Sequence, residues 1–134
     1  MPTRNERLAA VRRLPARGNV FNEQCPSREI LGHVTGRWGG LILTMLASNG
    51  TMRFSELRRS IGGITEKMLA ETLRNLERDG LLTRKVHPVI PPHVEYKLTT
   101  TGGQCATRLQ SLYRWLEEHV KAVVRCQIDY DTSD

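Results

Sequence analysis

The sequence has few cysteines, no long apolar run and none of the short motifs that mark common enzyme sites. Its three cysteines, Cys25, Cys105 and Cys126, are an odd number at wide spacings, which argues against a disulfide-built scaffold and a Cys-x-x-Cys zinc or redox pair. The longest apolar run is "LILTML" at 41–46, far shorter than the ~20 residues that cross a bilayer. The opening "MPTRNERLAAVRR" also lacks the apolar stretch of a secretory signal. We therefore expect a cytoplasmic protein with reduced thiols and no membrane contact.

Catalytic motifs are absent as well. The chain contains no GxGxxG, GxxxxGK[ST], HExxH or GxSxG, the patterns typical of nucleotide-binding, metalloprotease and hydrolase sites. Histidines at 33, 87, 93 and 119 fall on different expected elements without metal-ligand spacing. We therefore expect neither an enzyme nor a bound metal or cofactor.

Basic residues are concentrated in the first three quarters of the chain. Residues 1–24 hold five arginines and two glutamates, residues 25–100 hold eleven basic and seven acidic residues, and residues 101–134 hold four basic and five acidic ones. The net charge is +6 and the isoelectric point is about 9.7. This balance is compatible with binding a polyanion, because each phosphate contact releases condensed counterions. Charge alone does not separate a DNA-binding protein from any other basic protein.

Length and composition indicate one globular domain with flanking arms. A chain of 134 residues, 39% hydrophobic and 25% charged, is long enough to bury roughly two-thirds of its unfolded surface. We expect a basic N-terminal arm at 1–24, a domain with dimerisation helices at 25–126 and a C-terminal tail at 127–134. For the arm, three possibilities stay open: it lies along DNA, packs on a partner subunit, or is disordered. Its arginines are Arg4, Arg7, Arg12, Arg13 and Arg17.

Apolar spacing predicts two helices after the arm. A short amphipathic helix within 25–36 has apolar residues at Ile30, Leu31 and Val34, and Gly36 is expected to end it. The next, within 38–50, carries apolar residues around most of its circumference and stops near Gly50. A helix that is apolar on all sides is buried between others, so this one is expected at the centre of the core.

Two further helices form a helix-turn-helix. One lies within 52–63 with Ser55 as N-cap, and a double glycine follows it. The other runs over 65–79, with Thr65 as N-cap and Gly80 just past its last leucine turn. In a helix-turn-helix the second helix enters the major groove of DNA.

Downstream the apolar period changes from helical to two. Residues 81–86 and 94–98 read as strands, and the link "HPVIPPH" at 87–93 has three prolines that make a stiff hairpin tip. Residues 99–124 form a long amphipathic helix with a threonine cap at 99 or 101. The predicted fold is mainly α with a small β-hairpin: a winged helix-turn-helix with N- and C-terminal dimerisation helices.

The predicted recognition helix has a basic face opposite its leucines. At about 100° per residue, Lys67, Arg74 and Arg78 fall within roughly 40° of one another. Residues near the helix start reach deepest, so Lys67 is expected to donate to guanine and Glu71 to accept from cytosine, whereas Arg78 lies over phosphate and Arg74 does either. The alternative is a solvated basic face partly neutralised by Glu71. The candidate DNA-binding residues of this helix are Thr65, Lys67, Ala70, Glu71, Arg74 and Arg78.

Basic residues also border the predicted wing tip. We expect Arg84, Lys85, His87 and His93 to meet phosphates. The alternative for Arg84 and Lys85 is that they only keep an edge strand soluble.

Several successive motifs together resemble one family. "CPSREILGHVTGRW", "FSELRRSI", "ITEKMLAETLRNLERDGLLTR" and "IPPHVEYKLTTTG" are similar, in order, to motifs of the HxlR-type winged-helix transcription regulators. The resemblance runs from Cys25 to Gly102. It implies a homodimer built by the first and last helices, a recognition helix that reads double-stranded DNA, a wing on the flanking backbone or minor groove, and repression that is released when the protein senses a signal.

Cys25 is the candidate sensor. It directly precedes Pro26, a residue suited to a first helical turn, and Arg28 is close in sequence. A helix N-terminus and a nearby cation both lower a thiol pKa. Family members sense oxidants or electrophiles through a cysteine in this "CP" motif, so the resemblance implies the same role here. Two alternatives stay open. The Cys25 thiol only packs at an interface, or the signal is a small molecule that binds in the dimer crevice.

A function of a different class stays open at the level of sequence. A winged helix can serve as a protein-interaction module, with its basic face solvated or docked on an acidic partner. Loss of sequence preference on substitution of Lys67 or Arg74 distinguishes DNA reading from this alternative.

Overall fold

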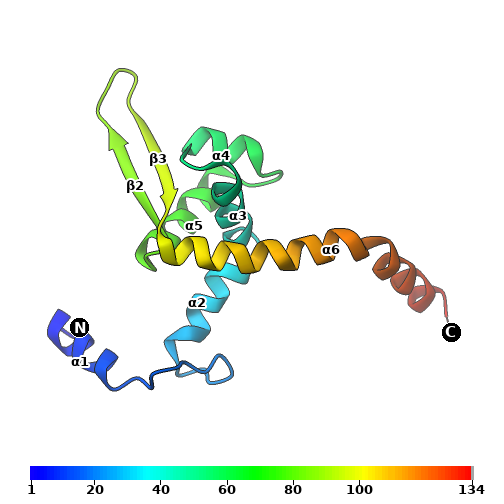
Figure 1. Cartoon of the computed structure of the whole chain (residues 1–134), viewed down its shortest axis with the longest axis horizontal. Coiled ribbons are helices and arrows are strands. Elements are labelled where there is room, and N and C mark those ends of the chain that lie inside the picture. The colour runs from blue at the N-terminus through cyan, green and yellow to red at the C-terminus, as the bar shows by residue number, and fades with distance from the viewer. Residues whose placement is uncertain (134) are drawn as a thin grey trace.

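The computed structural model describes residues 1–133, which form six helices and three short strands (Figure 1). The helices are α1 (Arg4–Arg12), α2 (Pro26–Thr35), α3 (Gly39–Asn49), α4 (Phe54–Ser60), α5 (Glu66–Arg78) and α6 (Thr100–Thr132), and the strands are β1 (Met52–Arg53), β2 (Leu82–His87) and β3 (His93–Leu98). The β2–β3 hairpin projects from the helical body, and α6 runs past one side of that body and continues beyond it. This is the predicted winged helix-turn-helix.

The helix-turn-helix is built from α4 and α5. Gly63, with φ of +83°, turns the chain between them, and Gly80, with φ of +74°, follows the end of α5. The Thr65 hydroxyl accepts from the Met68 N–H at 3.1 Å, which confirms the predicted N-cap. The prediction of Ser55 as the cap of the preceding helix is wrong. That helix is capped by Arg53, whose N–H donates to the Glu56 carboxylate at 3.0 Å, because Arg53 still belongs to an extended strand.

The sheet is antiparallel in the order β1-β3-β2. β1 has only two residues, too few for an alternating pattern to predict it. The hairpin register runs from Leu82 opposite Leu98 to His87 opposite His93. Side chains alternate between the two faces of a strand, and Tyr96 faces the core. Arg84, opposite Tyr96, therefore shares the inner face, whereas the odd-numbered residues of the hairpin share the outer face.

The core surrounds α3, as its all-round apolar pattern predicts. Ile42 and Leu43 of α3 are fully buried, and so are Leu69 and Leu76 of α5. A Cβ on Gly40 would lie 2.8 Å from the backbone carbonyl oxygen of Val34, so a glycine is needed for the close approach of α2 and α3. Because the leucines of α5 are buried in this core, the opposite face of α5 points to solvent.

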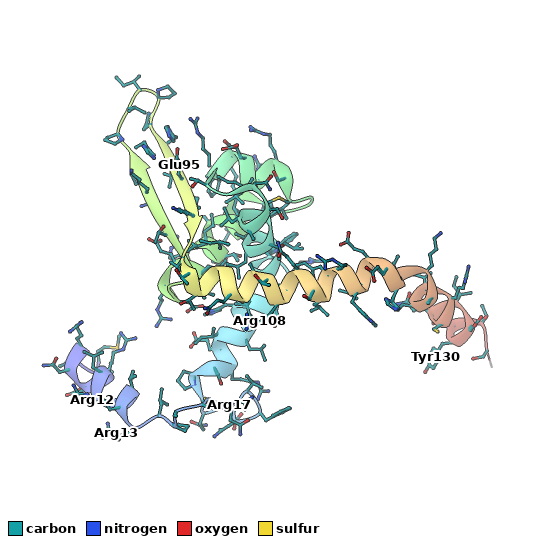
Figure 2. The ribbon with its side chains drawn as sticks, viewed as in Figure 1. Arg12, Arg13, Arg17, Glu95, Arg108 and Tyr130 are labelled. Carbon is teal, nitrogen blue, oxygen red and sulfur yellow. The ribbon has the colours of Figure 1, made fainter. Side chains whose placement is uncertain are left out.

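The two ends of the chain are more helical than the sequence pattern indicates. The arm contains α1, which begins with a reciprocal capping pair between Thr3 and Glu6. At the other end, α6 continues past Val124 to Thr132, through most of the segment expected to be a tail. Figure 2 shows Arg12 and Arg17 on the side of α6 opposite the wing. Within residues 1–133 no helix is long and apolar enough to cross a membrane.

Candidate nucleic-acid interface and thiol site

The exposed face of α5 presents the basic residues together. Lys67, Arg74 and Arg78 are all solvent-exposed, as is Glu71. Ala70 is half-buried between this face and the core. Thr65, exposed at the N-cap, is committed through its hydroxyl to the Met68 N–H. The structure thus places the six predicted residues along one helix, four of them with charged side chains directed to solvent.

Few acids compete for these charges. In residues 1–133 no carboxylate lies within ion-pair distance of Lys67, Arg74 or Arg78, so Glu71 forms no direct ion pair with them. The acid at the start of α5, Glu66, is paired instead with Arg58 of α4 at 3.2 Å. The sequence pattern does not single out Arg58, because its partner lies on the next helix and the pair forms only when the turn closes.

One of the predicted wing residues joins this face. A depression of about 370 Å³ lies between α5 and the hairpin, and Ala70, Arg74, Glu77 and Arg84 line it together with two core residues. Arg84 of β2 and Arg74 of α5 therefore lie on the same surface, although ten residues separate them in sequence. One basic side chain of α5 and one of the wing therefore line the same depression, together with the acidic Glu77.

The other wing residues behave differently. Lys85 is exposed, but His87 and His93 lie opposite each other on the outer face with their rings stacked at 4.6 Å. The Nε2 atoms of His87 and His93 lie 3.0 and 3.2 Å from the two carboxylate oxygens of Glu95 (labelled in Figure 2). Burial raises the pKa of Glu95, but the two neighbouring imidazoles outweigh it, so that the pKa is lowered overall. The two rings are thus directed at Glu95 and not outward.

Cys25 is the N-cap of α2, directly before Pro26. The Ser27 hydroxyl donates to its Sγ at 3.1 Å, and the Asn19 N–H lies 3.5 Å from the same sulfur. These hydrogen bonds, that of the Ser27 hydroxyl first, lower the pKa of the Cys25 thiol because they stabilise the thiolate. The expected contribution of Arg28 is not found, since its guanidinium reaches the Phe21 carbonyl at 3.5 Å. The sequence feature that could have predicted the lowered pKa is Ser27, two residues after the cysteine.

The other two thiols differ from Cys25. Cys105 is half-buried beside the core, and its burial raises its pKa. Cys126 is exposed on α6. The pKa of Cys25 is thus shifted in the direction opposite to that of Cys105.

A side-chain contact joins the thiol-bearing helix to the recognition helix. His33, near the C-terminal end of α2, places its Nδ1 2.6 Å from Oδ2 of Asp79, the residue that caps the C-terminus of α5. Both side chains are largely buried. Cys25 caps the start of α2 and His33 lies near its end, so α2 and this pair connect the thiol to the C-terminus of α5. Sequence alone gives no indication of it, because 46 positions separate the two residues.

Apolar side chains of the outer helices remain uncovered in the single chain. On α6 the exposed apolar residues follow helical steps along its projecting half: Leu112, Leu116, Val120, Val123, Val124 and Ile128. Ile30 and Leu31 of α2 are also more than a third exposed. Between α3 and α6 a groove of about 820 Å³ is lined by Leu41, Met45 and Leu116, among others. These surfaces are where a partner or an apolar ligand would be buried.

Comparison with known proteins gives a consistent result. The sequence model of the HxlR-like helix-turn-helix family matches residues 33–124. The HTH-type transcriptional regulator YtfH of Escherichia coli K12 is 56% identical over 107 residues, which are 80% of this chain and 84% of YtfH.

Two solved structures extend the comparison. The transcriptional regulator ytfH from Salmonella typhimurium is 53% identical, with a TM-score of 0.79 over 83% of this chain and 98% of that one. The redox regulator HypR in its oxidized form is 37% identical, with a TM-score of 0.62 over 70% of this chain and 96% of that one.

Proposed function

Because the chain belongs to the HxlR-like helix-turn-helix family of DNA-binding transcriptional regulators, we propose that it acts as a homodimeric, non-enzymatic repressor in the cytoplasm, and that modification of Cys25 by an oxidant or electrophile releases it from its operator. One observation supports this proposal more strongly than the others. The basic residues Lys67, Arg74 and Arg78 of α5 are exposed and form no ion pair within residues 1–133, and Arg74 lines one depression with Arg84 of the wing. A surface of that kind is what a phosphate backbone requires.

Positions along α5 assign the contacts. Thr65, Lys67, Ala70 and Glu71 occupy the first half of the helix, which in this motif lies deepest in the major groove. We assign base contacts to them, with Lys67 on guanine and Glu71 on cytosine. Arg78 in the last turn is assigned to phosphate. In the wing we assign phosphate contacts to Arg84 and Lys85, and a lesser one to each histidine, because Glu95 already engages both rings.

Fluorescence anisotropy tests the DNA reading. The reduced protein is titrated with the duplex upstream of its own gene and with a shuffled duplex, at about 0.15 M salt. Binding of the first duplex is expected to be roughly 10³-fold tighter. Lys67→Ala and Arg74→Ala should reduce this preference, whereas Arg78→Ala should weaken both duplexes alike and lower the salt slope by about 1.

A matched control is available on α6. Lys121 is an exposed lysine outside the α5 surface, so Lys121→Ala should leave both affinities and the salt slope unchanged. Equal affinity of the wild-type protein for a selected genomic site and a shuffled duplex would contradict DNA reading and favour a protein-interaction module.

The exposed apolar stripe of α6 supports the homodimer. Leu116 and Val120 are 46% and 53% exposed in the single chain, and the C-terminal part of α6 extends beyond the helical body (Figure 1). A second copy related by a two-fold axis buries the same stripe on both chains. Two recognition helices would then meet half-sites about 34–36 Å apart, or a multiple of that distance.

Sedimentation equilibrium measures this association. Val120→Asp should shift the protein toward monomer at micromolar concentration. Val89→Asp adds the same charge at an equally exposed apolar position, 52% exposed at the wing tip, and should leave the dimer intact. A monomeric wild-type protein would refute the homodimer and leave the assignment of DNA contacts standing.

The geometry of Cys25 supports its sensory role. Its thiolate is stabilised by Ser27 and Asn19, and α2 leads from it to the His33–Asp79 contact with α5. Brief treatment with a substoichiometric peroxide, followed by mass spectrometry, should find Cys25 oxidised before Cys105 and Cys126. Cys25→Ser should bind DNA normally and no longer lose affinity on oxidation. Release of the Cys25→Ser variant by oxidant would overturn the assignment.

A further inference from the structure

The outer face of the wing brings three metal-ligand side chains together. His87 ends β2 and His93 begins β3, and the hairpin register places them directly opposite each other. Glu95 follows His93 by two residues and so projects from the same face of β3. One ligand atom from each of the three residues lies within 4.8 Å of the other two. Nothing in the proposed DNA contacts requires a carboxylate between two imidazoles.

The donor atoms already have nearly the separation that a metal ion needs. A tetrahedral zinc ion with bonds of about 2.0–2.2 Å holds its ligand atoms roughly 3.4 Å apart. His87 Nε2 lies 3.0 Å from Glu95 Oε2, and His93 Nε2 lies 3.2 Å from Glu95 Oε1. All three ligand atoms lie within 4.8 Å of one another, so the side chains are already gathered on one side of the hairpin.

A second observation concerns His87 Nε2. This atom is fully buried, and despite its short distance to Glu95 it has no hydrogen bond of acceptable geometry. A buried nitrogen without a donor or acceptor partner is uncommon in folded proteins. Since the three side chains are 27%, 21% and 29% exposed, for His87, His93 and Glu95, the cluster is sheltered and yet reachable from solvent.

We propose that His87, His93 and Glu95 form a binding site for a zinc-type divalent transition-metal ion. Imidazole and carboxylate donors in a two-to-one ratio suit this class of ion. Three protein ligands leave a fourth position open for water or an anionic oxygen. The site departs from the expectation that no metal binds, because the ligands are assembled by strand pairing and not by a local spacing motif.

Metal binding has a consequence for the wing. The ion ties β2 to β3 next to the proline-rich tip and changes the local charge from that of one carboxylate to a net positive value. If the wing lies on DNA, this gain strengthens its attraction to phosphate. This consequence rests on the proposed function, whereas the metal site itself does not.

Zinc titration of the full chain tests the site. Protein freed of metal with a chelator is titrated with Zn²⁺ against a chromophoric competitor, and one equivalent per chain is expected. His93→Gln and His87→Gln should each weaken binding by more than about 100-fold, with far-ultraviolet circular dichroism unchanged. His119→Gln removes an imidazole that is stacked on Trp115 of α6 and should keep the full equivalent.

Cobalt separates this site from the thiols. Co²⁺ bound to His87, His93 and Glu95 should show visible bands without a near-ultraviolet thiolate charge-transfer band. A thiolate band, equal stoichiometry in wild type and His93→Gln, or no binding by the wild type would each overturn the proposal.

DNA binding gives a separate measurement. Zn²⁺ should tighten DNA binding of the wild type by roughly fivefold and leave His93→Gln unaffected. If Zn²⁺ binds one equivalent without that effect, the contact of the outer face of the wing with DNA is refuted and the metal site stands.

Discussion

Two neighbouring glycines of α6 give a test of how the wing is held to the helical body. Gly102 and Gly103 both lie in the first turns of α6, but their surroundings differ. A Cβ on Gly102 would overlap the carbonyl oxygen of Leu81 and lie 2.7 Å from its carbonyl carbon, whereas a Cβ on Gly103 would meet nothing within 4 Å. The Leu81 carbonyl also accepts from the Thr99 N–H at 3.1 Å, so the atom in the way is fixed backbone.

The expected effects have opposite signs. Gly102→Ala must push α6 away from Leu81, and overpacking against backbone is expected to cost about 3 kcal/mol. Gly103→Ala relieves the backbone entropy of a helical glycine and should stabilise by about 0.5–1 kcal/mol. For a chain of this size, 1 kcal/mol corresponds to roughly 4 °C in Tm. The Tm should therefore fall by about 12 °C in the first variant and rise by about 2–4 °C in the second.

Thermal unfolding followed by circular dichroism measures both variants. The protein concentration must be the same in all samples, because association makes Tm depend on concentration. Leu81 joins α5 to β2, so Gly102→Ala should also weaken DNA binding more than Gly103→Ala. Equal Tm values for the two variants would refute the reasoning, since both remove a helical glycine and only the contact with Leu81 distinguishes them.

Three further predictions concern single contacts. Ser27→Ala removes the main hydrogen bond to Cys25, so the thiol pKa should rise and the pH midpoint of iodoacetamide alkylation should move upward; an unchanged midpoint would show that Ser27 does not stabilise the thiolate. Thr65→Ala removes the cap of α5 and should lower the free energy of unfolding by about 1 kcal/mol in urea, whereas Thr65→Ser should lose little. Asp79→Asn weakens a largely buried contact with a histidine and should cost about 1.5–3 kcal/mol in the same assay; a loss below about 0.5 kcal/mol would mean that the pair does not hold α2 against α5.

The local sequence pattern was sufficient to predict much of this fold. The caps at Thr65 and Thr99, the glycines that follow α3 and α5, and the change from a helical to a two-residue period all depend on neighbours in sequence. Such signals persist in the unfolded chain, because capping, glycine conformation and side-chain alternation are properties of short segments. The basic face of α5 was predictable for the same reason, since helical geometry alone decides which residues share it.

Other features depend on which segments pair. Strand β1 exists only because β3 lies beside it, and that pairing moves the start of α4 to Phe54. Glu66 is neutralised by Arg58 only once the turn closes. The sequence shows an arginine near Cys25 but not that it points to the Phe21 carbonyl, because side-chain direction depends on how the preceding loop folds back.

The sequence by itself determined a winged helix-turn-helix with a basic recognition helix and a cysteine at a helix start. Only the tertiary structure decided that Arg84 shares the surface of α5, that His33 binds Asp79, and that His87 and His93 converge on Glu95. The physical reason is the same in each case. Helix faces and caps are set over a few residues, whereas these contacts join positions whose distance is fixed by strand register and helix packing.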